Sequence, residues 1–157
     1  MLSWLWLSLV VVILDQVSKQ LVESSLMVFE ILPVIPFLNL TLAYNEGAAF
    51  SFLADQGGWQ RWLFVLLAIG VTTVLIVWLG RLKTDDRLVA VALGLIIGGA
   101  SGNLIDRLLF GHVIDFVDIY YRDWHWPAFN LADSSIFLGV SLMLIDAFWG
   151  ASARERE

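Results

Sequence analysis

The sequence predicts an all-α membrane protein with four transmembrane helices, a small sheet on the outer membrane face and a short interfacial helix. Of its 157 residues, 59% are hydrophobic and only 15% are charged, whereas soluble domains carry roughly 25% charged residues. The mean hydropathy is +0.80. Four apolar stretches account for this excess, and each is long enough to cross a bilayer as a helix. A chain of this length is expected to form one membrane-embedded domain, residues 1–157.

The predicted spans are residues 2–22, 62–80, 88–105 and 134–150. The second and third contain no charged residue, and the fourth contains only Asp146. The first span is not preceded by a basic stretch and is not followed by an A-x-A-like cleavage site, so we expect it to be retained and not removed as a signal peptide.

The tryptophans mark the ends of these spans independently of hydropathy. An indole ring favours the headgroup layer, where its apolar body meets lipid and its N–H meets water. The eight tryptophans all fall at or just beyond a predicted span end: Trp4, Trp6, Trp59, Trp62, Trp78, Trp124, Trp126 and Trp149.

The distribution of basic residues predicts that both termini are cytoplasmic. The loop between the second and third spans, together with the C-terminal RERE, carries five Arg and Lys residues. The opposite side carries four, of which Lys19 and Arg107 lie beside acidic residues at span ends and are candidates for ion pairing. The positive-inside rule then orients the chain.

Two long segments, residues 23–61 and 106–133, lie on the outer side in this topology. The first contains FEILPVIPFLNLTLAYN and the second contains HVIDFVDIYY. Both are rich in β-branched and aromatic residues, which predicts short strands and hence a small sheet on the outer membrane face. The stretch ADQGGWQRW, residues 54–62, predicts a short interfacial helix or turn before the second span.

The third span carries a stripe of small residues that ends in polar ones. Gly94, Gly98 and Gly102 repeat every fourth residue and share one helix face, which lets a neighbouring helix approach closely. Asp106 continues this stripe, and Asn103 lies beside it. Packing alone explains the glycines but not the polar residues at the outer end of the span.

In the first span, Asp15 and Lys19 are separated by one helical turn and face each other. Ionisable residues within a span are costly and usually point into the bundle. The pair fits either a self-neutralising arrangement near the interface or a supporting role beside a functional site.

Two aspartates at the outer interface are candidates for chemistry. Asp115 lies in HVIDFV and Asp133 in FNLADSSI. Taken singly, Asp115 could be a strand residue facing water and Asp133 the N-cap of the fourth helix. Taken as a pair they suit hydrolysis, because two close carboxylates share a proton: the ionised one takes a proton from water and the protonated one polarises the scissile carbonyl. Asp118 and Asp123 are acidic candidates that are more loosely placed.

Other chemistries fit the sequence less well. The absence of cysteine excludes disulfides, thiolate metal sites and a cysteine nucleophile. No H-E-x-x-H motif is present, and His112 and His125 lie outside every span, where they do not suit a haem held in the bundle. A serine activated by Lys19 is an open alternative, although no Ser–Lys or Ser–His pairing is evident.

Two further functional classes also stay open. One is a small ion or proton carrier that uses Asp15, Asp106 and Asp146, although the polar residues gather at the outer edge. The other is a non-catalytic membrane scaffold or assembly factor. The formal charge of −6 argues against a nucleic-acid partner.

Five sequence blocks resemble those of one bacterial family, the lipoprotein signal peptidases, also called signal peptidase II. The blocks are DQVSK at 15–19, NEGAAFSFL at 45–53, GGASGNLIDR at 98–107, GHVIDF at 111–116 and FNLADSSI at 129–136. They occur in the family's order, and the resemblance covers nearly the whole chain.

This resemblance implies an aspartic endopeptidase embedded in the bacterial inner membrane. Such an enzyme removes the signal peptide from a diacylglyceryl-modified prolipoprotein by cutting just before the lipidated cysteine. The implied fold is four transmembrane helices with a small extracytoplasmic β-sheet cradle. No cofactor or metal is implied, and we expect a monomer whose partners are the prolipoprotein and membrane lipid.

The family motifs also assign roles to individual residues. Asp115 and Asp133 would be the catalytic pair. Substrate binding would fall to Asn45, Gly47, Asn103, Arg107 and Asn130, and support to Asp15, Lys19, Asp106 and Ala132. The positive end of the fourth helix should favour the charged form of Asp133. The apolar neighbours of Asp115 should favour its neutral form, which makes Asp115 the member protonated at rest.

Overall fold

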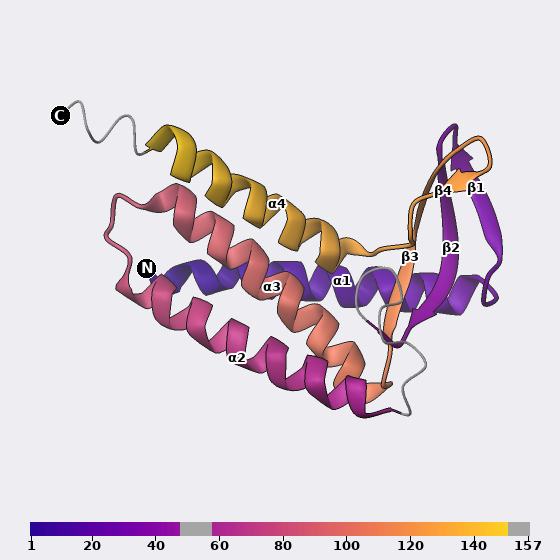
Figure 1. Cartoon of the computed structure of the whole chain (residues 1–157), viewed down its shortest axis with the longest axis horizontal. Coiled ribbons are helices and arrows are strands. Elements are labelled where there is room, and N and C mark those ends of the chain that lie inside the picture. Colours follow the sequence, from indigo (N-terminus) through magenta and orange to yellow (C-terminus); the bar gives the residue numbers. More distant parts are fainter. Residues whose placement is uncertain (48–57, 151–157) are drawn as a thin grey trace.

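The computed structural model describes residues 1–47 and 58–150, with the side chains of 149 and 150 excepted. Its four long helices run side by side along the longest axis of the molecule, and the sheet lies at one end of them (Figure 1). The helices are α1 Leu5–Ser25, α2 Trp59–Arg81, α3 Arg87–Leu109 and α4 Leu131–Ile145. A 3-10 turn, Leu2–Trp4, precedes α1, and a π-helical turn, Asp146–Gly150, follows α4.

All four helices are long and apolar enough to cross a membrane, which confirms the predicted number of spans. The helices run a few residues past the predicted apolar stretches at several ends. Hydropathy marks the lipid-facing zone, whereas the helical hydrogen-bond ladder continues wherever polar side chains find partners in the bundle. Near the C-terminal end of α3, Asp106 is such a residue, because it is fully buried and ion-paired.

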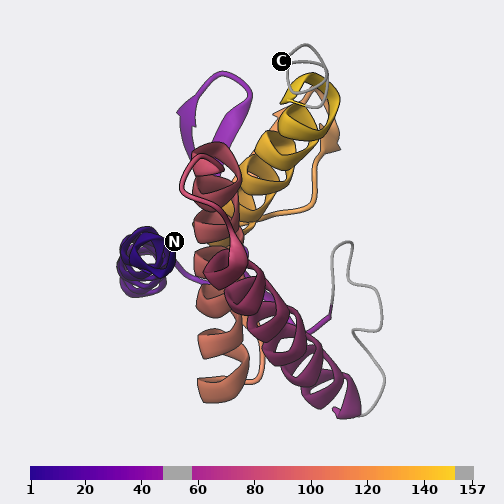
Figure 2. The same cartoon turned by 90° about the vertical axis from the view of Figure 1, so that its left-hand side faces the viewer.

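Helix α3 is the central helix and packs against the other three (Figure 2). Its glycine stripe faces α1, as the spacing predicted: a Cβ on Gly98 would lie 2.7 Å from the Cβ of Val11 and 2.9 Å from the carbonyl oxygen of Ser8. On another face of α3, a Cβ on Gly99 would collide with the backbone of Ala132 in α4. Small residues therefore set how closely both neighbours approach.

The sheet has four antiparallel strands in the order β1-β2-β3-β4. The strands are β1 Ile31–Ile35, β2 Leu38–Asn45, β3 Val113–Tyr121 and β4 Trp124–His125. The first three confirm the predicted strands. The two-residue strand β4 was not predicted, because the turn before it uses Arg122 at φ 56° and has no glycine or proline to signal it.

The surface of the bundle suits a lipid environment. Large apolar side chains such as Leu9, Leu66 and Phe137 are 60%, 68% and 76% exposed, which soluble proteins avoid over contiguous areas. The N-terminus, the α2–α3 connection and the end of α4 all lie at the end opposite the sheet (Figure 1). Of the predicted interfacial helix in residues 54–62, residues 54–57 lie outside the described residues and residues 59–62 already belong to α2.

Candidate active site

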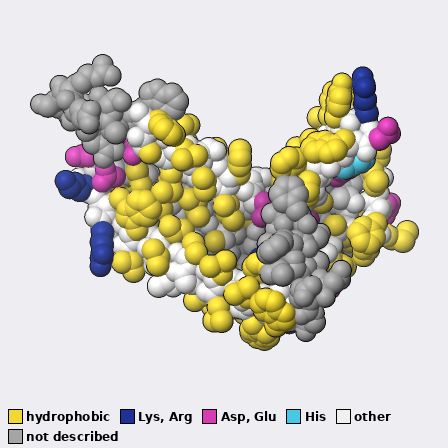
Figure 3. Space-filling view, in the orientation of Figure 1, with side chains coloured by type: hydrophobic (Ala, Val, Ile, Leu, Met, Phe, Trp, Pro, Cys, Tyr) yellow, Lys and Arg dark blue, Asp and Glu magenta, His cyan; other side chains and the backbone are white. Residues whose placement is uncertain are grey.

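Asp115 and Asp133 line the same cavity, which has a volume of about 1110 Å³. The cavity lies between the sheet and the ends of α3 and α4 that are nearest to the sheet. Figure 3 shows the molecule hollowed between bundle and sheet, with hydrophobic side chains on both sides and acidic atoms at the base. The apolar walls include Ile119, Trp124, Trp126, Ile136, Phe137 and Val140. Two carboxylates from distant parts of the chain therefore meet in a mainly apolar space.

Asp133 lies in the first turn of α4 and is not its N-cap. The N-cap is Asn130, whose Oδ1 accepts a hydrogen bond from the backbone N–H of Asp133 at 2.9 Å. In return, Asp133 Oδ2 accepts from the backbone N–H of Asn130 at 3.3 Å. The alternative in which Asp133 is the N-cap is therefore wrong, because the N-cap lies three residues earlier, at Asn130. The reason is that a carboxylate three residues inside the helix completes a capping box with the asparagine before it.

Asp115 extends from β3 and is only 3% exposed. Its Oδ2 accepts from Asn45 Nδ2 at 3.0 Å, and its Oδ1 accepts from Asn130 Nδ2 at 2.7 Å. Burial, reinforced by the nearby negative charge of Asp133, raises the pKa of Asp115 to about 7. The direction agrees with the expectation drawn from its apolar neighbours. A carboxyl with this pKa is partly protonated at neutral pH.

Three asparagines hold the two carboxylates. Asn103 Nδ2 donates to Asp133 Oδ1 at 2.7 Å, and Asn130 contacts both aspartates through its side chain and its backbone. Asn130 is completely buried. A neutral amide both donates and accepts, so it can position a carboxylate without adding a charge of its own.

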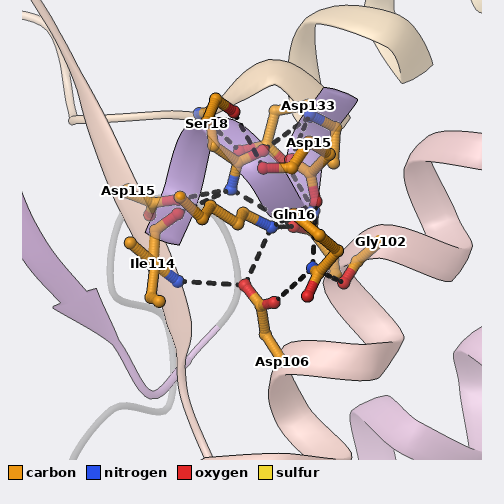
Figure 4. A network of polar contacts seen from close by, with 12 residues as sticks. Asp15, Gln16, Ser18, Gly102, Asp106, Ile114, Asp115 and Asp133 are labelled. Carbon is orange, nitrogen blue, oxygen red and sulfur yellow. Dashed lines mark hydrogen bonds and ion pairs between the residues drawn. The ribbon is translucent and has the colours of Figure 1, made fainter. Parts of the chain in front are cut away.

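A buried charge network lies directly behind these asparagines (Figure 4). Lys19 Nζ lies 2.8 Å from Asp15 Oδ2 and 2.8 Å from Asp106 Oδ2, and it donates to Asn103 Oδ1 at 3.0 Å. The three hydrogens of the ammonium group thus have three acceptors. Because Lys19 can only donate, the carbonyl of the Asn103 amide must face it, and this leaves the NH₂ group for Asp133.

The same network fastens the surrounding backbone. Asp15 Oδ1 accepts from the N–H of Ala132 at 3.0 Å, and Asp106 Oδ2 accepts from the N–H of Ile114 at 3.2 Å. Gln16 Nε2 donates to Asp106 Oδ1 at 2.7 Å. Sequence reasoning missed Gln16, because a single glutamine within a helix carries no signal until its partner helix is known.

Arg107 also lines the cavity. Its guanidinium donates to the carbonyl oxygens of Asn103 at 3.3 Å and Gly47 at 3.2 Å, and it lies 5.3 Å from the ring centroid of Phe64. The N–H of Gly47 donates to Asn45 Oδ1 at 3.0 Å. The predicted binding residues Asn45, Gly47 and Arg107 are therefore joined to one another at the cavity wall.

Other candidates lie apart from this cluster. Asp118 is bonded to Asn39 and His125, and Asp123 is exposed in the turn before β4. Asp146 lies in the π-helical turn at the opposite end of α4, so the acidic residues do not line a route along the bundle as a carrier would need. Lys19 is engaged with two carboxylates, which argues against a serine nucleophile activated by it.

In the part of the chain that the structure describes, no three His, Cys, Asp or Glu side chains gather closely enough to hold a metal ion. Four membrane-spanning helices, with a large cavity at one end lined by the buried Asp115 and the hydrogen-bonded Asp133, define an integral membrane protein with a candidate catalytic site. Residues 7–149 match the family described as signal peptidase (SPase) II, and the chain belongs to this family.

Curated relatives and solved structures agree with this assignment. The lipoprotein signal peptidase of Pseudomonas fluorescens strain Pf-5 is 54% identical over 149 residues, which cover 94% of this chain and 88% of that protein. The lipoprotein signal peptidase of Photorhabdus laumondii is 53% identical over 147 residues, with the same coverage. A solved structure of a bacterial membrane enzyme superposes with a TM-score of 0.88 at 32% identity, covering 99% of this chain and 93% of the other.

Proposed function

We propose that this protein is an aspartic endopeptidase that removes the signal peptide from diacylglyceryl-modified prolipoproteins, cutting before the lipidated cysteine. It acts in the bacterial inner membrane with its termini in the cytoplasm and its sheet on the outer face. The main support for the proposal is that Asn130 forms hydrogen bonds with both Asp115 and Asp133 within one apolar cavity at the end of the bundle.

The position of the cavity suits such a substrate. A signal peptide is hydrophobic and crosses the bilayer, and its cleavage site lies where it emerges. The cavity lies at the ends of α3 and α4, next to the sheet, and hence at the edge of the hydrocarbon zone. Its apolar walls can accept the signal peptide and the acyl chains, each buried CH₂ contributing about 0.8 kcal/mol.

The two aspartates divide the acid and base roles. Asp115, with a pKa of about 7, carries the proton at rest and donates a hydrogen bond to the carbonyl oxygen of the scissile peptide. Asp133 accepts from Asn103 and Asn130 and lies at the positive end of α4, so it acts as the ionised base. It takes a proton from a water molecule, whose oxygen attacks the carbonyl carbon.

Collapse of the tetrahedral intermediate breaks the C–N bond. The proton taken by Asp133 passes to the departing amine, which becomes the new N-terminus of the lipidated cysteine. The carbonyl carbon leaves as the carboxylic acid of the signal peptide, whose proton then passes through solvent to the new amine, and the pair returns to a state that shares one proton.

Asparagine and arginine side chains at the wall suit the polar backbone of the substrate. An unsatisfied peptide group near lipid costs several kcal/mol. Asn45, Asn103 and Arg107 line the cavity beside the carboxylates and carry amide and guanidinium groups of the kind that such a backbone needs. The buried network of Lys19 keeps Asn103 in the orientation that donates to Asp133.

The test is cleavage of purified precursors in detergent micelles. The substrates are one prolipoprotein with and without diacylglyceryl on its cysteine, and the product is identified by mass. We expect cleavage only of the lipidated form, at the bond before the cysteine. Equal rates on both forms, or a cut at another bond, would contradict the proposal.

A further inference from the structure

A second buried carboxylate lies on the opposite face of the sheet from the cavity. Asp118 is 6% exposed, and it accepts from Asn39 Nδ2 at 2.8 Å. His125 Nδ1 lies 2.8 Å and 3.0 Å from its two oxygens. Side chains alternate along a strand, and Asp115 and Ile119 of the same strand line the cavity, so Asp118 points away from it. We refer to Asn39, Asp118 and His125 as the clasp.

The clasp determines which way the β3–β4 hairpin faces. His125 lies between Trp124 and Trp126, and both tryptophans line the cavity. Holding His125 on the Asp118 face therefore turns its two neighbours to the cavity face. The ring of Tyr120 stacks on His125 with centroids 5.6 Å apart, which fixes the imidazole further.

Apart from the clasp, strand β4 itself has a short backbone ladder, and the segment after it is tied back to β3 at Phe129. Strand β4 has two residues, and only Tyr120 with His125 and Tyr121 with Trp124 are paired in register. The N–H of Trp126 adds one hydrogen bond to the carbonyl of Ile119 at 2.8 Å. A hairpin this short is marginal on its own, so a side-chain anchor at its centre has a large share in its position.

The cavity has two sides about the carboxylates. On one side Ile136, Phe137 and Val140 follow α4 into the bundle, and on the other Trp124 and Trp126 form a wall beyond the helix ends. A transmembrane signal peptide must follow the bundle. The tryptophan wall therefore faces the part of the substrate that follows the scissile bond, and this part begins with the lipidated cysteine.

We propose that the clasp positions Trp124 and Trp126 as the wall that receives the diacylglyceryl group of the substrate, an inference that rests on the proposed function. Indole suits this group, because its ring covers the first methylenes and its N–H can donate to an ester carbonyl. His125 is a positioning residue in this scheme. It touches neither substrate nor reacting atoms.

Steady-state kinetics on two precursors test this inference, one with long acyl chains and one with two-carbon acyl chains on the same glyceryl-cysteine. We expect Trp126→Ala and His125→Ala to raise KM for the long-chain precursor about tenfold, equal to about 1.4 kcal/mol, with kcat unchanged. Both variants should lose the preference for the long-chain form. His125→Asn, which can still donate to Asp118, should restore most of it. Asp123→Ala, an exposed change in the same hairpin, should behave as wild type.

A merely structural role would lower kcat or the active fraction for both precursors alike, and that result would overturn the inference. Unchanged KM in Trp126→Ala, which leaves the clasp intact and does not depend on refolding of the hairpin, would overturn it as well. If wild type cleaves neither precursor, the proposed function fails and the inference fails with it. If wild type cleaves and the variants keep its preference, only the inference fails.

Discussion

Replacing Asp115 by asparagine should make the protein more stable at alkaline pH while it removes activity. In the folded protein, burial and the charge of Asp133 raise the pKa of Asp115 from 3.8 to about 7. An asparagine has the shape of the protonated acid, but its NH₂ group cannot accept, so one of the two donors Asn45 and Asn130 loses its acceptor at every pH. The variant is still locked in the form that the folded state prefers, whereas wild type must ionise at high pH.

The pKa shift sets the size of the effect and its pH window. The unfolded carboxyl ionises near pH 3.8 and the folded one near pH 7. The contribution of Asp115 to the free energy of unfolding is therefore complete below pH 3.8, falls as the pH rises, and is lost above pH 7. The difference of about 3 pKa units, at about 1.4 kcal/mol each, gives a maximum of about 4 kcal/mol. Above pH 7 the difference between variant and wild type should stay constant.

The assay is equilibrium unfolding in mixed detergent micelles from pH 4 to pH 9, with wild type, Asp115→Asn and the exposed control Asp123→Asn. Subtracting the wild-type curve removes the contributions of all other groups. We expect the stability of Asp115→Asn relative to wild type to rise by about 4 kcal/mol between pH 4 and pH 7, on top of a constant offset for the lost acceptor, with the control following wild type throughout. A pH-independent difference, or a variant less stable at pH 9, would refute the reasoning.

Three further predictions concern the buried charges, the helix packing and the topology. Lys19→Met leaves the buried carboxylates of Asp15 and Asp106 without their cation, so the free energy of unfolding should fall by about 3–5 kcal/mol. A loss below about 1 kcal/mol in the same unfolding assay would show that these ion pairs are not needed for stability. Gly98→Ala places a Cβ 2.7 Å from the Cβ of Val11 and should destabilise by about 1–3 kcal/mol, whereas Gly70→Ala, with nothing within 4 Å of its Cβ, should be neutral. In this cysteine-free chain, a cysteine at Arg122 should be labelled by an impermeant reagent from outside the inner membrane and a cysteine at Lys83 should not; the reverse pattern would invert the topology.

Local patterns in the sequence predicted the elements that depend on local physics. Hydropathy identified the four helices, and the four-residue spacing that includes Gly98 identified the face that α1 packs against. The β-branched stretches identified three strands. In each case the signal lies in one continuous segment, and burial in lipid or in a sheet acts on that segment directly.

The connections between segments could not be predicted in the same way. That Lys19 joins Asp15 to Asp106 depends on the register between α1 and α3, and Lys19 lies more than 80 residues from Asp106 in sequence. The alternative that placed the N-cap at Asp133 was three residues late, although the spacing of Asn130 and Asp133 fits a capping box and could have indicated the correct residue. Strand β4 has only two residues and is held by a side chain on another strand, so no periodicity could reveal it.

The most direct test of the central claim is the rate of cleavage of a diacylglyceryl-modified precursor by wild type, Asp115→Asn, Asp133→Asn and the double variant at matched concentrations. Two carboxylates that act as one unit should each be indispensable, so either single change should abolish cleavage and the double variant should be little worse than the singles. Thermal unfolding of each variant serves as the control for folding. Substantial cleavage by a folded Asp115→Asn or Asp133→Asn protein would contradict the account.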